Sequence, residues 1–350
     1  MSEFFFSYGL FAAKVITVFI ILLVGILGIA LLLASRHKET ESIEIEKIND
    51  KFDSLKEALE SELLTKDEQK SLKKERKKQE KEEEKLIKQR LKEGTTEPLK
   101  PRLFVLRFMG DMHATGVDNL REEITAVLTV AKSSDEVLII LDSAGGLVHS
   151  YGLAASQLDR IRKRGIKLIV SIDLVAASGG YLMASVANHI IAAPFAVVGS
   201  IGVLAQLPNF HRLLKKHNID IEQHQAGEYK TTLTLLGENT EKAREKFRQE
   251  LEDTHVLFKQ FVSVHRPILN IDKLATGEHW YGTQALELKL VDELITSDDY
   301  LLKRSEHDDI YEVNYIINET LSDKISSLLE GLTGKLSKFI FETKLFQSRL

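Results

Sequence analysis

The sequence predicts an α/β protein in which a largely parallel sheet follows an N-terminal membrane helix and a charged helical spacer. Three observations predict this order: an apolar run near the N-terminus, a long segment that mixes acidic and basic residues, and short apolar strands that alternate with amphipathic helices from residue 102 onward. We therefore expect four parts, namely an anchor, a spacer, a globular domain and a C-terminal strand with an amphipathic helix, at residues 1–38, 39–98, 99–310 and 311–350.

The apolar run covers residues 15–34, where Thr17 is the only clearly polar side chain. As a helix it would rise about 30 Å, the thickness of a bilayer core. A cleaved signal peptide would need an early cationic region, a shorter apolar stretch and small residues before the cut, and Glu3 and Leu32 break that pattern. The sequence therefore predicts an uncleaved anchor. The flanking basic residues bias the C-terminal part only weakly toward the cytoplasm.

The spacer begins with apolar residues spaced three and four apart, the pattern of a short amphipathic helix or coiled coil: Ile45, Ile48, Phe52, Leu55 and Leu59. Residues 66–93 then intermix lysine and arginine with aspartate and glutamate. Mixed signs favour a solvated, salt-bridged helix over a patch for nucleic acid or lipid headgroups. Gly94, Pro98 and Pro101 mark the end of the spacer.

In the globular part, the sequence predicts strands in alternation with helices. The strands are expected at 103–108, 136–141 and 167–172, and the helices at 118–131 and 149–162. Two further apolar runs, 190–193 and 197–203, are interpreted as core strands, because a second membrane span across 182–207 would bury several polar side chains in lipid. Charged helical sequence follows from 241 to about 265, then a short α/β module, and a final amphipathic helix at about 321–345.

Composition excludes several kinds of protein. The chain has 350 residues, no cysteine and a formal net charge of −5. Without cysteine there is no disulfide framework, thiol nucleophile or zinc–thiolate site. The mildly acidic balance disfavours nucleic acid as the main partner. No H-E-x-x-H pattern occurs, which excludes a zincin, and we expect neither a metal nor a cofactor.

Ser178 is the candidate nucleophile. It lies in the stretch ASGGY (177–181), directly after a predicted strand and before an apolar helical stretch. Small neighbours allow a sharp turn, and a helix N-terminus favours developing negative charge. The stretch lacks the G-x-S-x-G elbow, so an α/β-hydrolase is not indicated. A plain N-cap serine is the alternative, and position alone favours it.

A second turn, DSAGG (142–146), also follows a predicted buried strand and opens a helix. Paired glycines, Gly145 and Gly146, let backbone N–H groups face outward, as an oxyanion hole or a phosphate cradle requires. The spacing is not G-x-G-x-x-G and no P-loop lysine follows, which disfavours a nucleotide. A tight turn without function is the alternative.

Lys230, in the stretch GEYKTT (227–232), is the candidate base, because none of the eleven histidines lies in an obvious triad context. A lysine accepts a proton only when neutral, and with an ordinary pKa of about 10.4 this costs about 4 kcal/mol near pH 7.5. Burial supplies such a shift. An exposed loop lysine is the commoner alternative.

Four stretches in this order, DSAGG, ASGGY, GSIG (199–202) and GEYK, resemble the signal peptide peptidase A family of serine–lysine peptidases, peptidase family S49. The resemblance covers residues 103–294 most closely. The anchor, the spacer and the stretches 231–239 and 275–282 make the chain most similar to the inner-membrane members of that family. The resemblance implies a ClpP/crotonase-like fold, without a cofactor.

The resemblance also implies roles for individual residues. Ser178 matches the nucleophile, Lys230 the general base, and Ser200 the serine that orients the lysine amine. Backbone N–H groups of Gly179 and of the pair Gly145–Gly146 match the oxyanion hole. Many family members carry proline where this chain has alanine in DSAGG, which concerns turn rigidity only.

The family further implies a homo-oligomer whose sites are shared, because in half-length members serine and lysine come from neighbouring subunits of a ring. Its members usually place the catalytic domain on the periplasmic face of the bacterial inner membrane, against the weak charge bias above. The expected substrates are peptides or unfolded protein segments near the membrane.

Two other functions remain open at this stage. A crotonase-like acyl-CoA enzyme would share the fold, and Glu228 is the one tempting carboxylate near the candidate residues. The anchor and the Ser/Lys pair argue against it. A non-catalytic membrane scaffold with a vestigial dyad is the second, and intact dyad residues argue against that.

Overall fold

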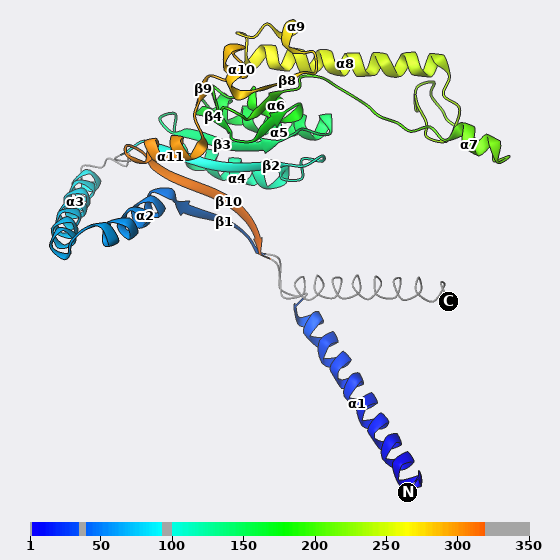
Figure 1. The fold of residues 1–350 in the computed structure, drawn as a ribbon, viewed down its shortest axis with the longest axis horizontal. Helices are drawn as coiled ribbons and strands as arrows, with labels where there is room; N and C mark the ends of the chain where they lie inside the picture. The colour runs from blue at the N-terminus through cyan, green and yellow to red at the C-terminus, as the bar shows by residue number, and fades with distance from the viewer. Residues whose placement is uncertain (1, 35–39, 93–99, 319–350) are drawn as a thin grey trace. The chain divides into compact units, whose positions relative to one another are not determined.

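The computed structural model describes residues 2–34, 40–92 and 100–318 (Figure 1). The chain forms two units. The smaller comprises Met1–Ser42 with Tyr315–Leu350, and the larger comprises Ile43–Asn314. Each is described by itself.

In the smaller unit, helix α1 spans Ser2–Ala34. Among residues 2–34, 40–92 and 100–318, no helix has the length and apolar character needed to cross a bilayer. The anchor at 15–34 therefore stays a prediction. The amphipathic helix expected at about 321–345 lies outside the described residues.

A largely parallel sheet forms the centre of the larger unit, as predicted. Its main order is β1-β10-β2-β3-β4-β6-β9, while β5 pairs with β3 and β7; the pairs from β10 through β9 are parallel, and β8 pairs antiparallel with β7. The strands are β1 Thr40–Lys47, β2 Arg102–Gly110, β3 Glu136–Ser143, β4 Lys167–Ile172, β5 Val175–Ala177, β6 His189–Ala192, β7 Val197–Gly199, β8 His279–Tyr281, β9 Glu293–Leu294 and β10 Asp309–Asn318.

Helices cover both faces of this sheet, which explains why its central strands are apolar on both sides. On β2, Phe104, Leu106 and Phe108 pack into one buried cluster, whereas Leu103 and Val105 pack into another. The first cluster contains side chains of α4 (Val117–Val130), α5 (Val148–Lys163), α6 (Gly179–Ala184) and α8 (Glu241–His265). The second contains side chains of α2 (Ile48–Leu63) and α11 (Ser297–Ser305).

Most predicted elements of the globular part are confirmed to within two residues, and β4 and α8 have the predicted bounds. Two expectations were wrong in detail. Strand β7 ends at Gly199 and not at 203, because the backbone turns there with φ +105°. The helix of the spacer begins at Ile48, and Ile45 lies in β1, where its β-branched side chain is well accommodated. The spacer's charged segment forms α3, Lys66–Lys92.

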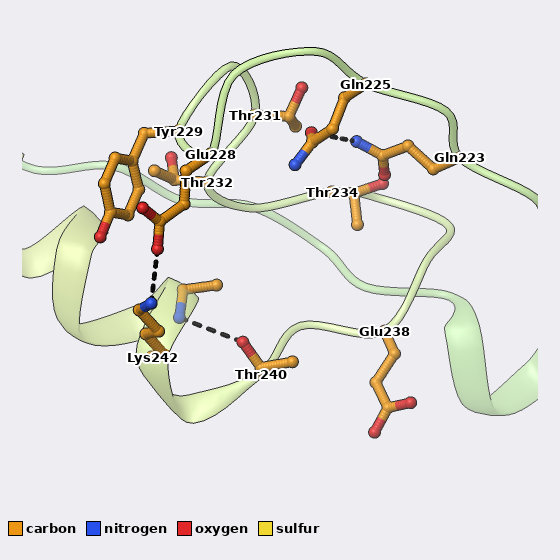
Figure 2. A pocket seen from close by; sticks show the side chains of 11 residues that line it. Gln223, Gln225, Glu228, Tyr229, Thr231, Thr232, Thr234, Glu238, Thr240 and Lys242 are labelled. Atoms are coloured by element: carbon orange, nitrogen blue, oxygen red, sulfur yellow. Dashed lines mark hydrogen bonds and ion pairs between the residues drawn. The ribbon is translucent and has the colours of Figure 1, made fainter.

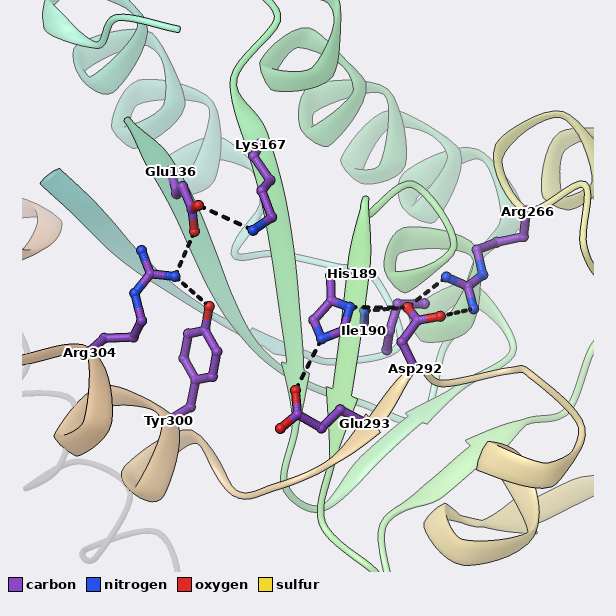
Figure 3. Close-up of polar contacts among 9 residues, drawn as sticks. All are labelled: Glu136, Lys167, His189, Ile190, Arg266, Asp292, Glu293, Tyr300 and Arg304. Carbon is purple, nitrogen blue, oxygen red and sulfur yellow. Dashed lines mark hydrogen bonds and ion pairs between the residues drawn. The ribbon is translucent and has the colours of Figure 1, made fainter. Parts of the chain in front are cut away.

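Two arginines join helices on either face to the sheet through ion pairs (Figure 3). Arg266, which caps α8 and is 5% exposed, donates to both carboxylate oxygens of Asp292 at 2.8 and 2.9 Å. Burial acts to raise the pKa of the Asp292 carboxyl, but the hydrogen bonds from Arg266 and the Ile190 N–H, together with the charges of Arg266 and His189, outweigh it and hold that pKa below its usual range. On the other face, Arg304 of α11 donates to Glu136 of β3 at 2.7 Å.

Only the C-terminal part of the long helix α8 reaches the core. Val262 is fully buried there. The opposite end of α8 lies beside the segment that carries α7, His211–Lys216, away from the sheet (Figure 1). We call residues 203–240 the arm. It has little regular structure besides α7 and ends where α8 begins. The remaining short helices are α9 Ile271–Leu274 and α10 Gly282–Glu287.

Candidate active site

Three turns meet at the carboxyl edge of the sheet. Ser143 at the end of β3 is in register with Ala176 of β5, and Ala177 is in register with Gly199 of β7. Because the strands are parallel, the turns that follow them project from the same edge. These turns carry the candidate glycines 145 and 146, the candidate nucleophile Ser178 and the candidate orienting residue Ser200. The structure therefore brings together five of the six predicted site residues, since Gly179 follows Ser178.

Ser178 occupies the N-cap position of α6 in an unusual backbone conformation, φ 51° and ψ −118°. Its N–H donates to the Gly199 carbonyl at 2.8 Å, and its own carbonyl accepts from Leu182 at 2.9 Å. A positive φ at a residue with a side chain costs of order 1–3 kcal/mol and persists only where the surroundings enforce it. Such strain is typical of functional turns and unusual for a simple capping serine.

Gly145 lies directly against this turn. With φ +87°, it occupies a conformation that suits glycine, and a Cβ there would lie 2.7 Å from the Gly179 nitrogen and 2.8 Å from Ser178 Cβ. The Gly145 N–H donates to Ser143 Oγ at 3.1 Å, so it is engaged inside the protein. Gly179, as the first residue of α6, has an N–H without an acceptor within its helix.

Ser200 follows β7 with φ 53°, and its N–H donates to the Glu278 carbonyl at 2.7 Å. The adjacent strand β8 closes this corner. A Cβ on Gly199 would lie 2.8 Å from the ring of Trp280, so only glycine fits there. The stretch 275–282 thus supports the turn that carries Ser200, a role that the sequence did not indicate.

Lys230 is not beside Ser178 in the same chain. It is exposed, in the last part of the arm. Two residues earlier, Glu228 pairs with Lys242 in the first turn of α8 at 2.5 Å (Figure 2). From Lys242 to the buried Val262 the helix rises about 30 Å at 1.5 Å per residue. Tyr229 and Thr232, on either side of Lys230, contact Lys246 and Glu250, so Lys230 lies beside the N-terminal half of α8 and away from its buried end.

The arm and the start of α8 enclose a polar cavity of ≈ 320 Å³. Hydroxyl, amide and charged side chains from the stretch 223–243 line it (Figure 2). Glu228, the carboxylate considered for acyl-CoA chemistry, lines this cavity and pairs with Lys242, so it is not at the glycine turns. Within residues 2–34, 40–92 and 100–318, no group of three or more His, Cys, Asp or Glu is placed to hold a metal ion.

Two buried hydroxyls beneath the glycine turns escaped the sequence analysis. Tyr151 of α5 is fully buried, with its hydroxyl 2.5 Å from Ser143 Oγ. Burial raises the pKa of the Tyr151 phenol. In the sequence, Ser143 is distinctive only as part of the stretch DSAGG. Tyr151 lies on the apolar face of a predicted helix, and such a tyrosine gives no local signal of a role near the turns.

Comparison with known proteins agrees with this arrangement of motifs. The family model "Peptidase family S49 N-terminal" matches residues 3–158, and "Peptidase family S49" matches residues 160–310. The chain is 48% identical over 333 residues to the "Probable protease SohB" of Haemophilus influenzae, covering 94% of each chain. It is also 48% identical over 337 residues to the protein of that name from Buchnera aphidicola subsp. Acyrthosiphon pisum, covering 96% of this chain and 97% of the relative.

Solved structures give a weaker likeness. The 1510-N membrane-bound stomatin-specific protease aligns with a TM-score of 0.41 and 14% identity, over 66% of this chain and 99% of that one. At this TM-score the ClpP/crotonase assignment stays a prediction, while the mixed α/β sheet is observed directly. Two family models that together cover most of the chain, and relatives of nearly equal length at 48% identity, establish the family. This chain belongs to peptidase family S49 and is a peptidase of the SppA/SohB type.

Proposed function

We propose that the chain is a membrane-anchored serine endopeptidase that cleaves peptides or unfolded protein segments through a Ser178–Lys230 dyad and an acyl-enzyme. The observation that carries the proposal is the strained Ser178 at the start of α6, in contact with a glycine turn at the carboxyl edge of the sheet. A serine so held presents its hydroxyl next to the positive end of a helix, where an oxyanion is favoured.

The reaction would proceed in two halves. Neutral Lys230 Nζ accepts the Ser178 Oγ proton while Oγ bonds to the peptide carbonyl carbon, and backbone N–H groups stabilise the resulting oxyanion. When the carbon–nitrogen bond breaks, the leaving amine takes the proton from the lysine. Water then attacks the ester carbon and gives a proton to the lysine. The lysine returns this proton to Ser178 Oγ as the ester bond breaks, which releases the acid and restores the free serine and the neutral lysine.

The distance between the two residues leads us to propose that a working site is shared between subunits. Lys230 lies between Tyr229 and Thr232, which contact Lys246 and Glu250 of α8. These two positions are about 24 and 18 Å along the helix from the buried Val262, at 1.5 Å per residue. The arm exposes a run of apolar side chains that a neighbouring chain would cover: Leu204, Leu207, Phe210, Leu213, Ile219, Ile221, Leu235 and Leu236. Docking of the arm on a neighbour would also bury Lys230, which a lysine base requires.

The membrane attachment rests on the apolar run at 15–34, long enough to cross a bilayer core. We propose that this run anchors the chain in the bacterial inner membrane with the catalytic domain on the periplasmic face. Substrates would then be segments that emerge near the bilayer. Fusing a reporter that is active on only one side of the membrane to the C-terminus tests the orientation.

The dyad is tested with the purified full-length chain and a fluorogenic peptide. We expect Ser178→Ala and Lys230→Ala to lose turnover, whereas Lys215→Ala, which removes another exposed lysine of the arm, keeps it. Labelling by a fluorophosphonate should disappear with Ser178→Ala. Turnover that survives either dyad substitution removes that residue from the mechanism.

Sharing of the site has its own test. Coexpressed Ser178→Ala and Lys230→Ala subunits should recover roughly a quarter of wild-type activity, because random mixing in a ring gives that fraction of interfaces both intact residues. A site within one chain predicts no recovery.

A further inference from the structure

Two buried hydroxyls, those of Ser143 and Tyr151, join the turn at Gly145 to the backbone of Asp111. The Gly145 N–H donates to Ser143 Oγ at 3.1 Å, Ser143 Oγ lies 2.5 Å from the Tyr151 hydroxyl, and that hydroxyl donates to the Asp111 carbonyl at 2.7 Å. Tyr151 is 0% exposed and Ser143 1% exposed. Four groups from three separate segments are therefore joined within the core.

The direction of every hydrogen bond in this chain is fixed. A carbonyl only accepts, so the single phenolic proton of Tyr151 goes to Asp111. The Tyr151 oxygen must then accept the hydroxyl proton of Ser143, and Ser143 Oγ accepts the Gly145 N–H. Bonds aligned in one direction polarise one another, which strengthens the chain as a unit.

Glycines leave room for these two hydroxyl side chains. A Cβ on Gly110 would collide with Ser143 Oγ and the Tyr151 hydroxyl, and one on Gly180 would collide with the Ser143 carbonyl. A Cβ on Gly179 would collide with the Tyr151 ring. Tyr151 thus contacts both sides of the candidate site: its hydroxyl reaches the Gly145 turn, and its ring lies under the residue that follows Ser178.

The remainder of the turn is held by the segment that accepts the tyrosine proton. Leu147 N–H donates to the Met112 carbonyl at 2.9 Å, and Gly146 lies against that same carbonyl. Asp111 is itself fixed, because its carboxylate accepts from the Thr115 N–H at 2.9 Å. The 111–112 segment is therefore a firm support on which the glycine turn rests.

We propose that Tyr151 is a positioning residue for the oxyanion hole, acting through Ser143 on the turn at Gly145–Gly146. The inference rests on the proposed function. With its N–H held inward by Ser143, Gly145 is not an oxyanion donor itself, and its fixed backbone determines where the next N–H, that of Gly146, points. The donors facing the substrate are then the N–H groups of Gly146 and Gly179.

Tyr151→Phe isolates the hydroxyl. The atoms of Tyr151 nearest a Cβ on Gly179 are Cβ, Cγ and Cδ1, which phenylalanine retains. Tyr181→Phe is the matched control, because Tyr181 is also 0% exposed and its hydroxyl also donates to a carbonyl, that of Leu290 at 3.0 Å. Tyr181→Phe loses one hydrogen bond and Tyr151→Phe loses two, those to Asp111 and Ser143, but only the Tyr151 hydroxyl is joined to the Gly145 turn.

The experiment measures kcat and KM for a fluorogenic peptide, and the melting temperature, in the full-length wild type and in Tyr151→Phe, Ser143→Ala, their double variant and Tyr181→Phe. We expect kcat to fall about 10- to 100-fold in Tyr151→Phe with KM within about twofold. Tyr181→Phe should also melt at a lowered temperature but keep kcat. The double variant should lose no more kcat than the worse single variant, since both substitutions break one chain.

The outcomes separate the two proposals. Wild-type turnover with an unchanged kcat in Tyr151→Phe overturns the positioning role and leaves the dyad intact. An equal loss of kcat in both tyrosine variants, or losses that multiply in the double variant, also overturns it, because the effect would then be general destabilisation. A wild type that neither turns over peptide nor is labelled at Ser178 contradicts the proposed function and the inference with it.

Discussion

Replacing Gly145 by alanine tests the packing of the glycine turn against the candidate nucleophile. The added Cβ would lie 2.7 Å from both the Ala177 carbonyl oxygen and the Gly179 nitrogen, and 2.8 Å from Ser178 Cβ. Ordinary contacts begin near 3.4 Å. All three neighbours belong to the turn that carries the nucleophile, so that turn or Gly145 must move.

The magnitude has two parts. The positive φ of Gly145 costs alanine about 1–2 kcal/mol in any surroundings. Relieving the collisions requires a displacement of roughly half an ångström or more at Ser178, and misplacement of reacting groups by about 1 Å costs of order 10²-fold in rate. A 10²-fold loss corresponds to about 2.7 kcal/mol of barrier. We expect kcat to fall about 10²-fold in Gly145→Ala.

Gly165→Ala is a control that separates the cost of the positive φ from the cost of the collisions. Gly165 has φ +74°, close to that of Gly145, but nothing lies within 4 Å of an added Cβ. This control should lose about 1–2 kcal/mol of stability and keep its kcat. The assay is peptide turnover together with urea unfolding of the same preparations.

The reasoning is refuted if Gly145→Ala turns over peptide at the wild-type rate and unfolds at the same urea concentration as Gly165→Ala. The turn that carries Ser178 would then have space for a methyl group on residue 145, which the distances above exclude. If Gly145→Ala loses stability but keeps its kcat, then the collision is relieved by a movement of residue 145 and not by a movement of Ser178.

Three further predictions concern the scaffold. Asp292→Asn leaves the buried Arg266 without its countercharge and should destabilise the larger unit by about 3–5 kcal/mol in urea unfolding. The pKa of Asp292 is lowered in the folded state, so its contribution to folding stability is present above its unfolded pKa, near pH 4, and is lost as pH falls through the folded pKa. Below about pH 4, the melting temperature of the wild type should therefore fall more steeply with acid than that of Asp292→Asn. Ile48→Ala should cost about 2–5 kcal/mol, because that side chain is 5% exposed in the cluster between the sheet and α2. Gly199→Ala should shift the emission of Trp280, the only tryptophan, because the new methyl group collides with its ring.

Each of these has a contrary result. Equal acid dependence in the wild type and Asp292→Asn would show that this pair does not control acid stability. If Ile48→Ala lowers the free energy of unfolding by less than about 0.5 kcal/mol, the range of ordinary surface substitutions, then α2 does not pack against the core through Ile48. Unchanged emission in Gly199→Ala would mean that β8 does not close over Ser200 as described.

The alternation of strands and helices was readable in the sequence because it depends on local patterns. Strand β4 and helix α8 had the predicted bounds, since β4 is a continuous buried apolar run and α8 carries charged residues from end to end. The end of β7 was placed too late, because Val203 continues the apolar run while the backbone has already turned at Gly199. Apolar character does not encode that turn, which Trp280 enforces from a distant part of the chain.

The same contrast holds for the candidate site. Ser178 and the paired glycines stood out because serine and glycine directly after a buried strand are locally distinctive. Tyr151 did not stand out, since its partners Ser143 and Asp111 lie 8 and 40 residues away. Hydrogen bonds between separate segments leave no periodicity in the sequence.

By itself, the sequence determined which segments become strands and helices and which residues are candidates for the chemistry, because these follow from residue type, spacing and the resemblance of four short motifs. Only the tertiary structure decided how they meet. The parallel register of β3, β5 and β7 gathers three turns at one edge of the sheet, whereas the length of α8 holds Lys230 away from Ser178. The physical reason is that register and helix direction are set by side chains packing across the whole domain, and such packing joins residues far apart in the chain.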